Sequence, residues 1–303
     1  MTLRFAAPVG LEDALSLLAA DPAARVVAGG TDLVVAARQG RKPLPESIVA
    51  IDRIAELAGH EVVDGSLVLG ALTDHAWLAS SPEVRTRWTA LADAASIVGS
   101  PATRGTGTIG GNLMNASPAA ETIAPLVVLD ARVTLRAAGG ASRTLAAGEL
   151  ATGPGRTLAT QGEVLTRVTV AAIAAGSGSA YIRLEYRRAM EIAIVGAAAL
   201  VTIADGVVRE SRIALTAVAP TIVRAPEAED ALRGSPATRE SFLEAGRAAA
   251  AAARPIDDVR ASADYRTAML EVVVARVLAD AAARAAGEPI PVPASRWAHG
   301  QEL

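Results

Sequence analysis

Residues 27–33 have the sequence Val-Ala-Gly-Gly-Thr-Asp-Leu, and the glycine pair in this stretch follows a β-branched segment that predicts a strand. Paired glycines permit positive φ and let a ligand approach the backbone without a Cβ atom in between. Successive N–H groups in such a turn form a concave site for phosphate oxygens. Because the third glycine of a GxGxxG fingerprint is absent, an ordinary tight turn is an equal alternative on spacing alone.

Helix and strand patterns alternate on both sides of this turn. The apolar residues at 11, 14, 15 and 18 have helical spacing, and residues 47–51 predict a strand. We therefore expect a first α/β unit over residues 1–53. A second unit is expected over residues 54–175, with strands near 67–69 and 133–135 and helices marked by Val84, Trp88, Leu91 and Ala95 and by residues 121–130.

A second glycine-rich segment lies inside this second unit. Residues 99–117 have little periodicity, and Thr106–Pro118 combine paired glycines with hydroxyl and amide side chains. Ile109, Leu113 and Met114 offer apolar contact to an aromatic ring system. Long unstructured segments in compact domains are usually disordered or functional. Alone, the segment also fits a wide surface loop, but two such loops suit an elongated ligand with a diphosphate in its middle.

The last part of the chain predicts a separate α+β domain. Residues 174–179 predict a linker, and strands are expected at 181–186, 192–203 and 212–218 with a hairpin at Asp205-Gly206. Residues 227–286 predict helices. The expected domain spans residues 179–288, and residues 289–303 are expected to form an extended tail.

Composition excludes several classes of function. The chain has 303 residues, 51% of them hydrophobic, and a net charge of -3, so neither nucleic acid nor an acidic membrane is an expected partner. The absence of cysteine excludes disulfides, thiolate zinc sites and cysteine-ligated iron–sulfur clusters within it. Its longest apolar run, 192–204, is too short to cross a bilayer and no export signal is evident, so a cytoplasmic protein without membrane insertion is expected.

No acid–base machinery is evident. His75 is expected at a helix start or on the surface, and Ser80-Ser81 are expected to cap the helix that begins at Pro82. The arginines at 183, 187 and 188 predict a solvated or inter-subunit face rather than an active site. We expect no catalytic residue and no metal ligand in this chain.

Residues 28–33 and 108–113, with 115–120 behind them, resemble the two FAD-binding loops of the flavin subunit of the molybdenum hydroxylases, the xanthine dehydrogenase and carbon monoxide dehydrogenase family. Residues 187–193 and 217–225 resemble the C-terminal domain of that subunit. The resemblance covers residues 6–286. It implies a vanillyl-alcohol-oxidase-type FAD-binding domain of two α/β subdomains plus a C-terminal α+β domain.

The resemblance also implies which residues contact the cofactor. The first loop would wrap the FAD diphosphate with Val26, Val27, Ala28, Gly29, Gly30, Thr31, Asp32 and Leu33. The second would line the ribityl and flavin parts with Thr103, Gly107, Thr108, Gly110, Gly111, Asn112 and Asn115. Glu121 stands where aspartate is commoner and would bond the ribityl or adenosine side. Val164 and Leu165 would pack on the adenine or flavin, and Glu191 also replaces a common aspartate.

The function implied is that of an oxidoreductase subunit for electron transfer. A large subunit that carries molybdopterin would supply electrons to two [2Fe–2S] clusters of a small subunit. FAD would receive the electrons from these clusters and pass them to NAD⁺ or another acceptor. The partners would form a heterohexamer, and the Thr31-Asp32 pair favours a xanthine dehydrogenase-like complex. Two alternatives stay open: a stand-alone FAD-dependent oxidase or dehydrogenase of the same fold, and a flavin-free scaffolding subunit.

Overall fold

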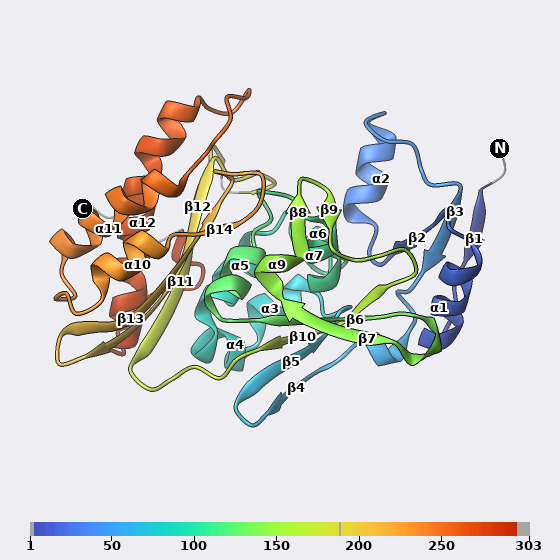
Figure 1. The fold of residues 1–303 in the computed structure, drawn as a ribbon, viewed down its shortest axis with the longest axis horizontal. Helices are drawn as coiled ribbons and strands as arrows, with labels where there is room; N and C mark the ends of the chain where they lie inside the picture. The colour runs from blue at the N-terminus through green and yellow to red at the C-terminus, as the bar shows by residue number, and fades with distance from the viewer. Residues whose placement is uncertain (1–2, 188, 296–303) are drawn as a thin grey trace.

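The computed structural model describes residues 3–187 and 189–295, and its sheets follow one another along the chain (Figure 1). The first sheet is parallel, with strand order β1 (Arg4–Ala6), β3 (Ser47–Ala50), β2 (Ala24–Val27). Helix α1 (Leu11–Ala20) buries Leu11, Ala14, Leu15 and Leu18, which confirms the predicted stripe. Helix α2 (Thr31–Arg38) buries none of its residues, and it projects away from the sheet in Figure 1.

The second sheet is antiparallel throughout. Its strand order is β4 (His60–Val63), β5 (Ser66–Gly70), β10 (Val164–Val170), β6 (Arg132–Arg136), β7 (Ser142–Ala146), and a small pair, β8 (Ala151–Gly153) and β9 (Arg156–Thr157), lies apart from it. The helix predicted across Val84–Ala95 is two helices, because Trp88 leaves helical geometry with φ -120° and ψ 52°. The helical segments of this unit are η1 (Ala55–Leu57), α3 (His75–Ser80), α4 (Pro82–Arg87), α5 (Thr89–Ile97), α6 (Pro101–Arg104), α7 (Ile109–Asn115), α8 (Ile123–Val128), η2 (Ala138–Gly140) and α9 (Ala147–Leu150).

The third sheet is also antiparallel and is covered by the C-terminal helices, at the left of Figure 1. Its strands are β11 (Ser177–Leu184), β12 (Val195–Ala204), β13 (Val207–Thr216) and β14 (Val223–Arg224), and the helices are α10 (Pro226–Leu232), α11 (Arg239–Ala252) and α12 (Ala263–Ala285). The hairpin at Asp205 and Gly206 is confirmed, with φ of 56° and 72°. The mixed α/β and α+β class is confirmed as well.

The predicted linker 174–179 is partly wrong, since β11 begins at Ser177. Gly178 packs directly against helix α12, where a Cβ atom would overlap the carbonyl oxygen of Ala281. Glycine is therefore needed at 178 for close strand–helix packing, whereas the sequence pattern suggests a flexible linker. Residues 296–303 of the predicted tail lie outside the described residues. Within the described ranges, no helix is both long enough and apolar enough to cross a membrane.

Candidate functional site

The first glycine turn joins strand β2 to helix α2. Gly30 directly precedes the first residue of α2 and has φ +68°, a left-handed conformation that glycine adopts at little cost. Its carbonyl oxygen accepts a hydrogen bond from the N–H of Val34 at 2.9 Å, which begins the helix. Residues 26–33 therefore span the carboxyl end of a parallel strand, the edge of a sheet where ligands are commonly bound.

The second glycine segment is more ordered than its low periodicity predicts. It contains helices α6 and α7, and a hydroxyl residue caps each of them. Ser100 accepts from the N–H of Thr103 at 3.1 Å, and Thr108 accepts from the N–H of Gly111 at 3.0 Å. Such caps satisfy N–H groups that a short helix leaves unpaired, so local hydrogen bonds rather than an apolar stripe organise this segment.

The two glycine loops are in direct contact. A Cβ atom at Gly29 would overlap the carbonyl oxygen of Thr106. A Cβ atom at Gly107 would lie 3.7 Å from the hydroxyl of Thr31. Glycine is therefore required at 29 by the close approach of a second backbone, and the two glycine loops lie side by side.

Residues 71–75 hold the second loop in position. The N–H of Gly110 donates to the carbonyl of Ala71 at 2.9 Å, the N–H of Ile109 to that of Thr73 at 2.9 Å, and the N–H of His75 to the carbonyl of Gly107 at 3.2 Å. These are backbone contacts between segments distant in sequence. No residue pattern in the sequence indicates them, so the sequence predicts both loops but not the segment that joins them.

The surroundings of Gly111 leave room for a ligand. A Cβ atom there would meet, among the described residues, only the Thr108 hydroxyl within 4 Å. Nearby polar side chains have protein partners: the Asn112 side-chain oxygen accepts from the hydroxyl of Thr122 at 2.7 Å, and the Thr103 hydroxyl lies 3.0 Å from that of Ser100. Asn115 is exposed. The open space over Gly111 and the left-handed Gly30 fit a ligand that lies along the backbone of both loops.

Three of the predicted cofactor residues lie inside the protein. Val164 and Leu165 are 2% and 3% exposed and belong to two different apolar cores. The carboxylate of Glu121 accepts from the hydroxyl of Tyr181 and from Nη1 of Arg183, each at 2.5 Å. Burial raises the pKa of Glu121, and the neighbouring Arg183 opposes that rise. A contact of these three residues with a cofactor stays a prediction.

Arg183 does not belong to a solvated face, so that prediction is wrong. Its side chain is fully buried, and it forms ion pairs with Glu121 and Glu185. The residue lies on the buried strand β11, where two carboxylates compensate its charge. Arg187 is 67% exposed and pairs with Glu191 at 3.2 Å, as a surface residue would. Arg188 lies outside the described residues.

His75 begins helix α3 as predicted, but it is not on the surface. Asp74 caps this helix by accepting from the N–H of Trp77 at 2.7 Å, and the His75 side chain is 2% exposed. Burial lowers the pKa of His75 to about 4, so the imidazole is neutral near pH 7. The sequence Thr-Asp-His predicts a polar helix start, and it carries no signal that the ring is buried beside Gly107.

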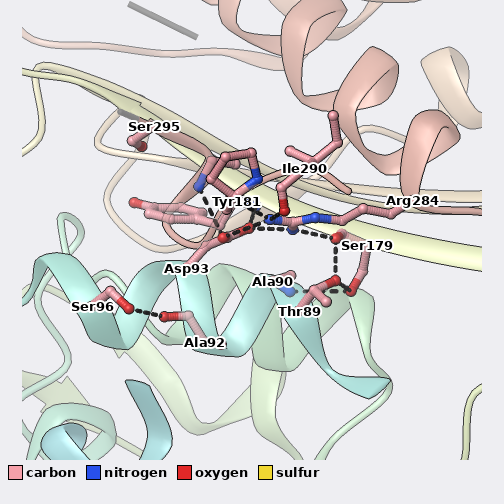
Figure 2. A network of polar contacts seen from close by, with 12 residues as sticks. Thr89, Ala90, Ala92, Asp93, Ser96, Ser179, Tyr181, Arg284, Ile290 and Ser295 are labelled. Atoms are coloured by element: carbon pink, nitrogen blue, oxygen red, sulfur yellow. Dashed lines mark hydrogen bonds and ion pairs between the residues drawn. The ribbon is translucent and has the colours of Figure 1, made fainter. Parts of the chain in front are cut away.

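A buried ionic network fixes the C-terminal domain to helix α5 (Figure 2). The carboxylate of Asp93 accepts from Arg284 at 2.6 and 3.0 Å, from the N–H of Tyr181 at 3.0 Å and from the N–H of Ala294 at 2.9 Å. The Thr89 hydroxyl donates to the carbonyl of Ser179. Since α5 leads directly into the second glycine segment, this network sets where β11 and α12 stand relative to it. Across the described residues, no group of three His, Cys, Asp or Glu side chains could hold a metal ion.

Comparisons with protein families match nearly the whole chain. Residues 1–172 match the FAD binding domain in molybdopterin dehydrogenase, and residues 180–281 match the CO dehydrogenase flavoprotein C-terminal domain. The carbon monoxide dehydrogenase medium chain of Hydrogenophaga pseudoflava is 36% identical over 92% of this chain and 97% of its own. The nicotine 6-hydroxylase medium subunit of Paenarthrobacter nicotinovorans is 30% identical over 93% of this chain and 98% of its own.

Solved structures give the same picture. The carbon monoxide dehydrogenase structure from Hydrogenophaga pseudoflava superposes with a TM-score of 0.89 over 94% of this chain and 98% of the matched chain, at 36% identity. Quinoline 2-oxidoreductase from Pseudomonas putida 86 superposes with a TM-score of 0.88 over 94% of this chain and 98% of the matched chain, at 28% identity. A xanthine dehydrogenase FAD-binding subunit of Escherichia coli O157:H7 is 29% identical over 92% of this chain and 95% of its own. These identities give no support to the preference for a xanthine dehydrogenase-like complex.

Proposed function

Because the chain belongs to the family of FAD-binding medium subunits of molybdenum hydroxylases, we propose that it holds FAD across its two glycine loops and transfers electrons within a multi-subunit oxidoreductase. The observation that carries this proposal is the backbone contact between Gly29 and Thr106. It brings two polar, glycine-rich turns side by side, as a dinucleotide bound to both would require.

The chain's own residues would bind and orient the cofactor. N–H groups and hydroxyls of Val26–Leu33 would hold the diphosphate, because consecutive donors in a left-handed turn converge on anionic oxygens. Thr103, Gly107, Thr108, Gly110, Gly111, Asn112 and Asn115 would line the other half, with Glu121, Val164 and Leu165 behind them. Bound FAD supplies one- and two-electron redox chemistry, so the protein needs no acid–base group of its own.

Other polypeptides would complete the electron path. We expect a small subunit with [2Fe–2S] clusters, which need cysteine ligands that this chain lacks, and a molybdopterin large subunit. The relatives named as medium chains support this expectation. Val34 and Val35 on α2 are 43% and 46% exposed, so this helix offers apolar surface for a partner to cover. NAD⁺ or another acceptor would receive the electrons, and a heterohexamer is the expected assembly.

Co-expression with the two partner chains tests the proposal. Substrate added anaerobically to the purified complex should bleach the flavin absorption, and the isolated chain with the same substrate should not respond. Bleaching of the isolated chain would favour a stand-alone flavin oxidase instead. Failure of the three chains to co-purify would contradict the relay.

A further inference from the structure

His75 is a buried polar side chain to which the proposed function assigns no role. It is 2% exposed, and its Nδ1 has no hydrogen-bond partner among residues 3–187 and 189–295. Most buried polar atoms in proteins are hydrogen-bonded, so the missing partner of Nδ1 bears on which nitrogen of the ring carries the proton. His75 ends the segment 71–75 that holds the second glycine loop, so it lies beside the site where the cofactor is proposed to bind.

The ring is oriented by its contact with the second loop. Its Cδ2 atom lies 3.3 Å from the position that a Cβ atom of Gly107 would take, and the Thr31 hydroxyl lies 3.7 Å from the same point. In an imidazole, Nε2 is bonded to Cδ2, whereas Nδ1 lies across Cγ from it. The ring therefore meets the second loop through Cδ2, Nε2 flanks that contact, and Nδ1 lies on the far side of the ring.

The protonation of the ring follows from these surroundings. Since burial lowers the pKa of His75 to about 4, the ring is neutral near pH 7 and carries one N–H. A buried donor without an acceptor is costly, and Nδ1 has no acceptor among the described residues. The proton is therefore assigned to Nε2, which leaves Nδ1 as an unprotonated nitrogen.

We propose that His75 is a cofactor-binding residue whose Nε2–H donates a hydrogen bond to the FAD diphosphate where the two loops meet. The diphosphate is the expected acceptor because Thr31, which belongs to the loop assigned to it, approaches the same point. A neutral donor suits this position, since it adds a directed hydrogen bond without a second buried charge. This inference rests on the proposed function, because it assumes FAD at this site.

Substitution of His75 by glutamine or by asparagine distinguishes the role of Nε2 from that of Nδ1. The glutamine amide in His75→Gln reaches the Nε2 position, the asparagine amide in His75→Asn reaches only the Nδ1 position, and His75→Leu keeps apolar bulk without a donor. The exposed His60, which stacks on Trp77 with ring centroids 3.6 Å apart, supplies the matched control His60→Gln. FAD affinity of the flavin-stripped full chain, ³¹P NMR of the bound diphosphate and thermal unfolding without FAD are measured for each.

We expect His75→Leu and His75→Asn to lower FAD affinity by about 10-fold or more and to shift a diphosphate ³¹P signal, since a hydrogen bond to a charged group is lost. His75→Gln and His60→Gln should stay within about 3-fold of wild type. Equal affinity in all four variants would overturn the role of His75. The role would also be overturned if all three His75 variants lost FAD affinity to the extent that their unfolding temperatures fell. Loss of packing would then explain the weaker binding. A wild-type chain that binds no FAD would overturn the proposed function itself.

Discussion

The carbonyl oxygen of Thr106 occupies the position that a Cβ atom of residue 29 would need, so Gly29 and Thr106 are in direct backbone contact. One residue belongs to the turn after β2 and the other to the segment before α7. The contact makes the geometry of each loop depend on the other. A change at Gly29 should therefore disturb both halves of the site, although it lies in only one of them.

Gly29→Ala should lower the free energy of unfolding by about 1–3 kcal/mol, because backbone must move to admit the methyl group. It should also reduce the FAD retained on purification. Denaturant unfolding and flavin absorbance measure the two effects. The matched control is Gly105→Ala, where the nearest atom to a new Cβ lies at 3.8 Å and φ is not positive. If both variants behave like wild type, the loops are not in the contact described.

Gly111→Val should abolish FAD retention and leave the C-terminal domain folded. The first added carbon lies 3.0 Å from the Thr108 hydroxyl, and the branches extend into the open space over the turn. Gly111→Ala adds only that first carbon and should retain more flavin than the valine variant. Flavin-to-protein absorbance ratios and far-UV circular dichroism measure both outcomes. A valine variant that holds FAD as well as wild type would show that the second loop has been misassigned.

The sequence predicts those parts of the fold and site that depend on local patterns. The stripe on α1, the hairpin at Asp205-Gly206 and the Ser81 cap of α4 each follow from spacing or turn chemistry, and each is confirmed. The start of strand β11 at Ser177 was not predicted, because the close packing of Gly178 on α12 has no signal in the local sequence. Packing of that kind depends on residues distant in sequence.

The burial of single polar residues could not be predicted from the sequence either. Arg183 and His75 are polar residues whose sequence neighbours give no sign of a core, and both are at most 2% exposed. Arg183 is buried because Glu121, from a distant helix boundary, supplies a compensating charge. Such pairings depend on tertiary structure, so a sequence pattern places these residues on the surface by default.

Arg183→Leu should destabilise the chain by about 3–5 kcal/mol, because Glu121 and Glu185 would lose their shared buried cation. Arg187→Leu is the control. Its side chain is 67% exposed, and pairs at the surface contribute only about 0–1 kcal/mol. Urea unfolding of both variants gives the comparison. Equal, small effects would contradict the buried ion-pair network.

Asp280→Asn should change how stability depends on pH. The pKa of Asp280 is raised from 3.8 to about 6, because burial and the nearby Asp93 raise it by more than Arg284 and Arg276 lower it. The folded state therefore binds this proton more tightly than the unfolded state. The resulting stabilisation is fully present below about pH 4 and is lost as the pH rises through about 6.

The asparagine variant lacks this titration, so its stability relative to wild type should increase between pH 4 and pH 8 by up to about 3 kcal/mol. Chemical unfolding at a series of pH values measures the difference. Asp264→Asn, at an exposed position of the same helix, should follow the wild-type profile. Parallel profiles for Asp280→Asn and wild type would show that Asp280 does not titrate in this range.

The FAD content of the purified wild-type chain tests the central claim most directly. After expression without partners and incubation with excess FAD, gel filtration should yield a yellow protein with flavin bands at about 375 and 450 nm and about one FAD per chain. Acid precipitation should release the flavin, because the proposed binding is not covalent. A folded, colourless protein with no bound flavin after the same treatment would contradict the account.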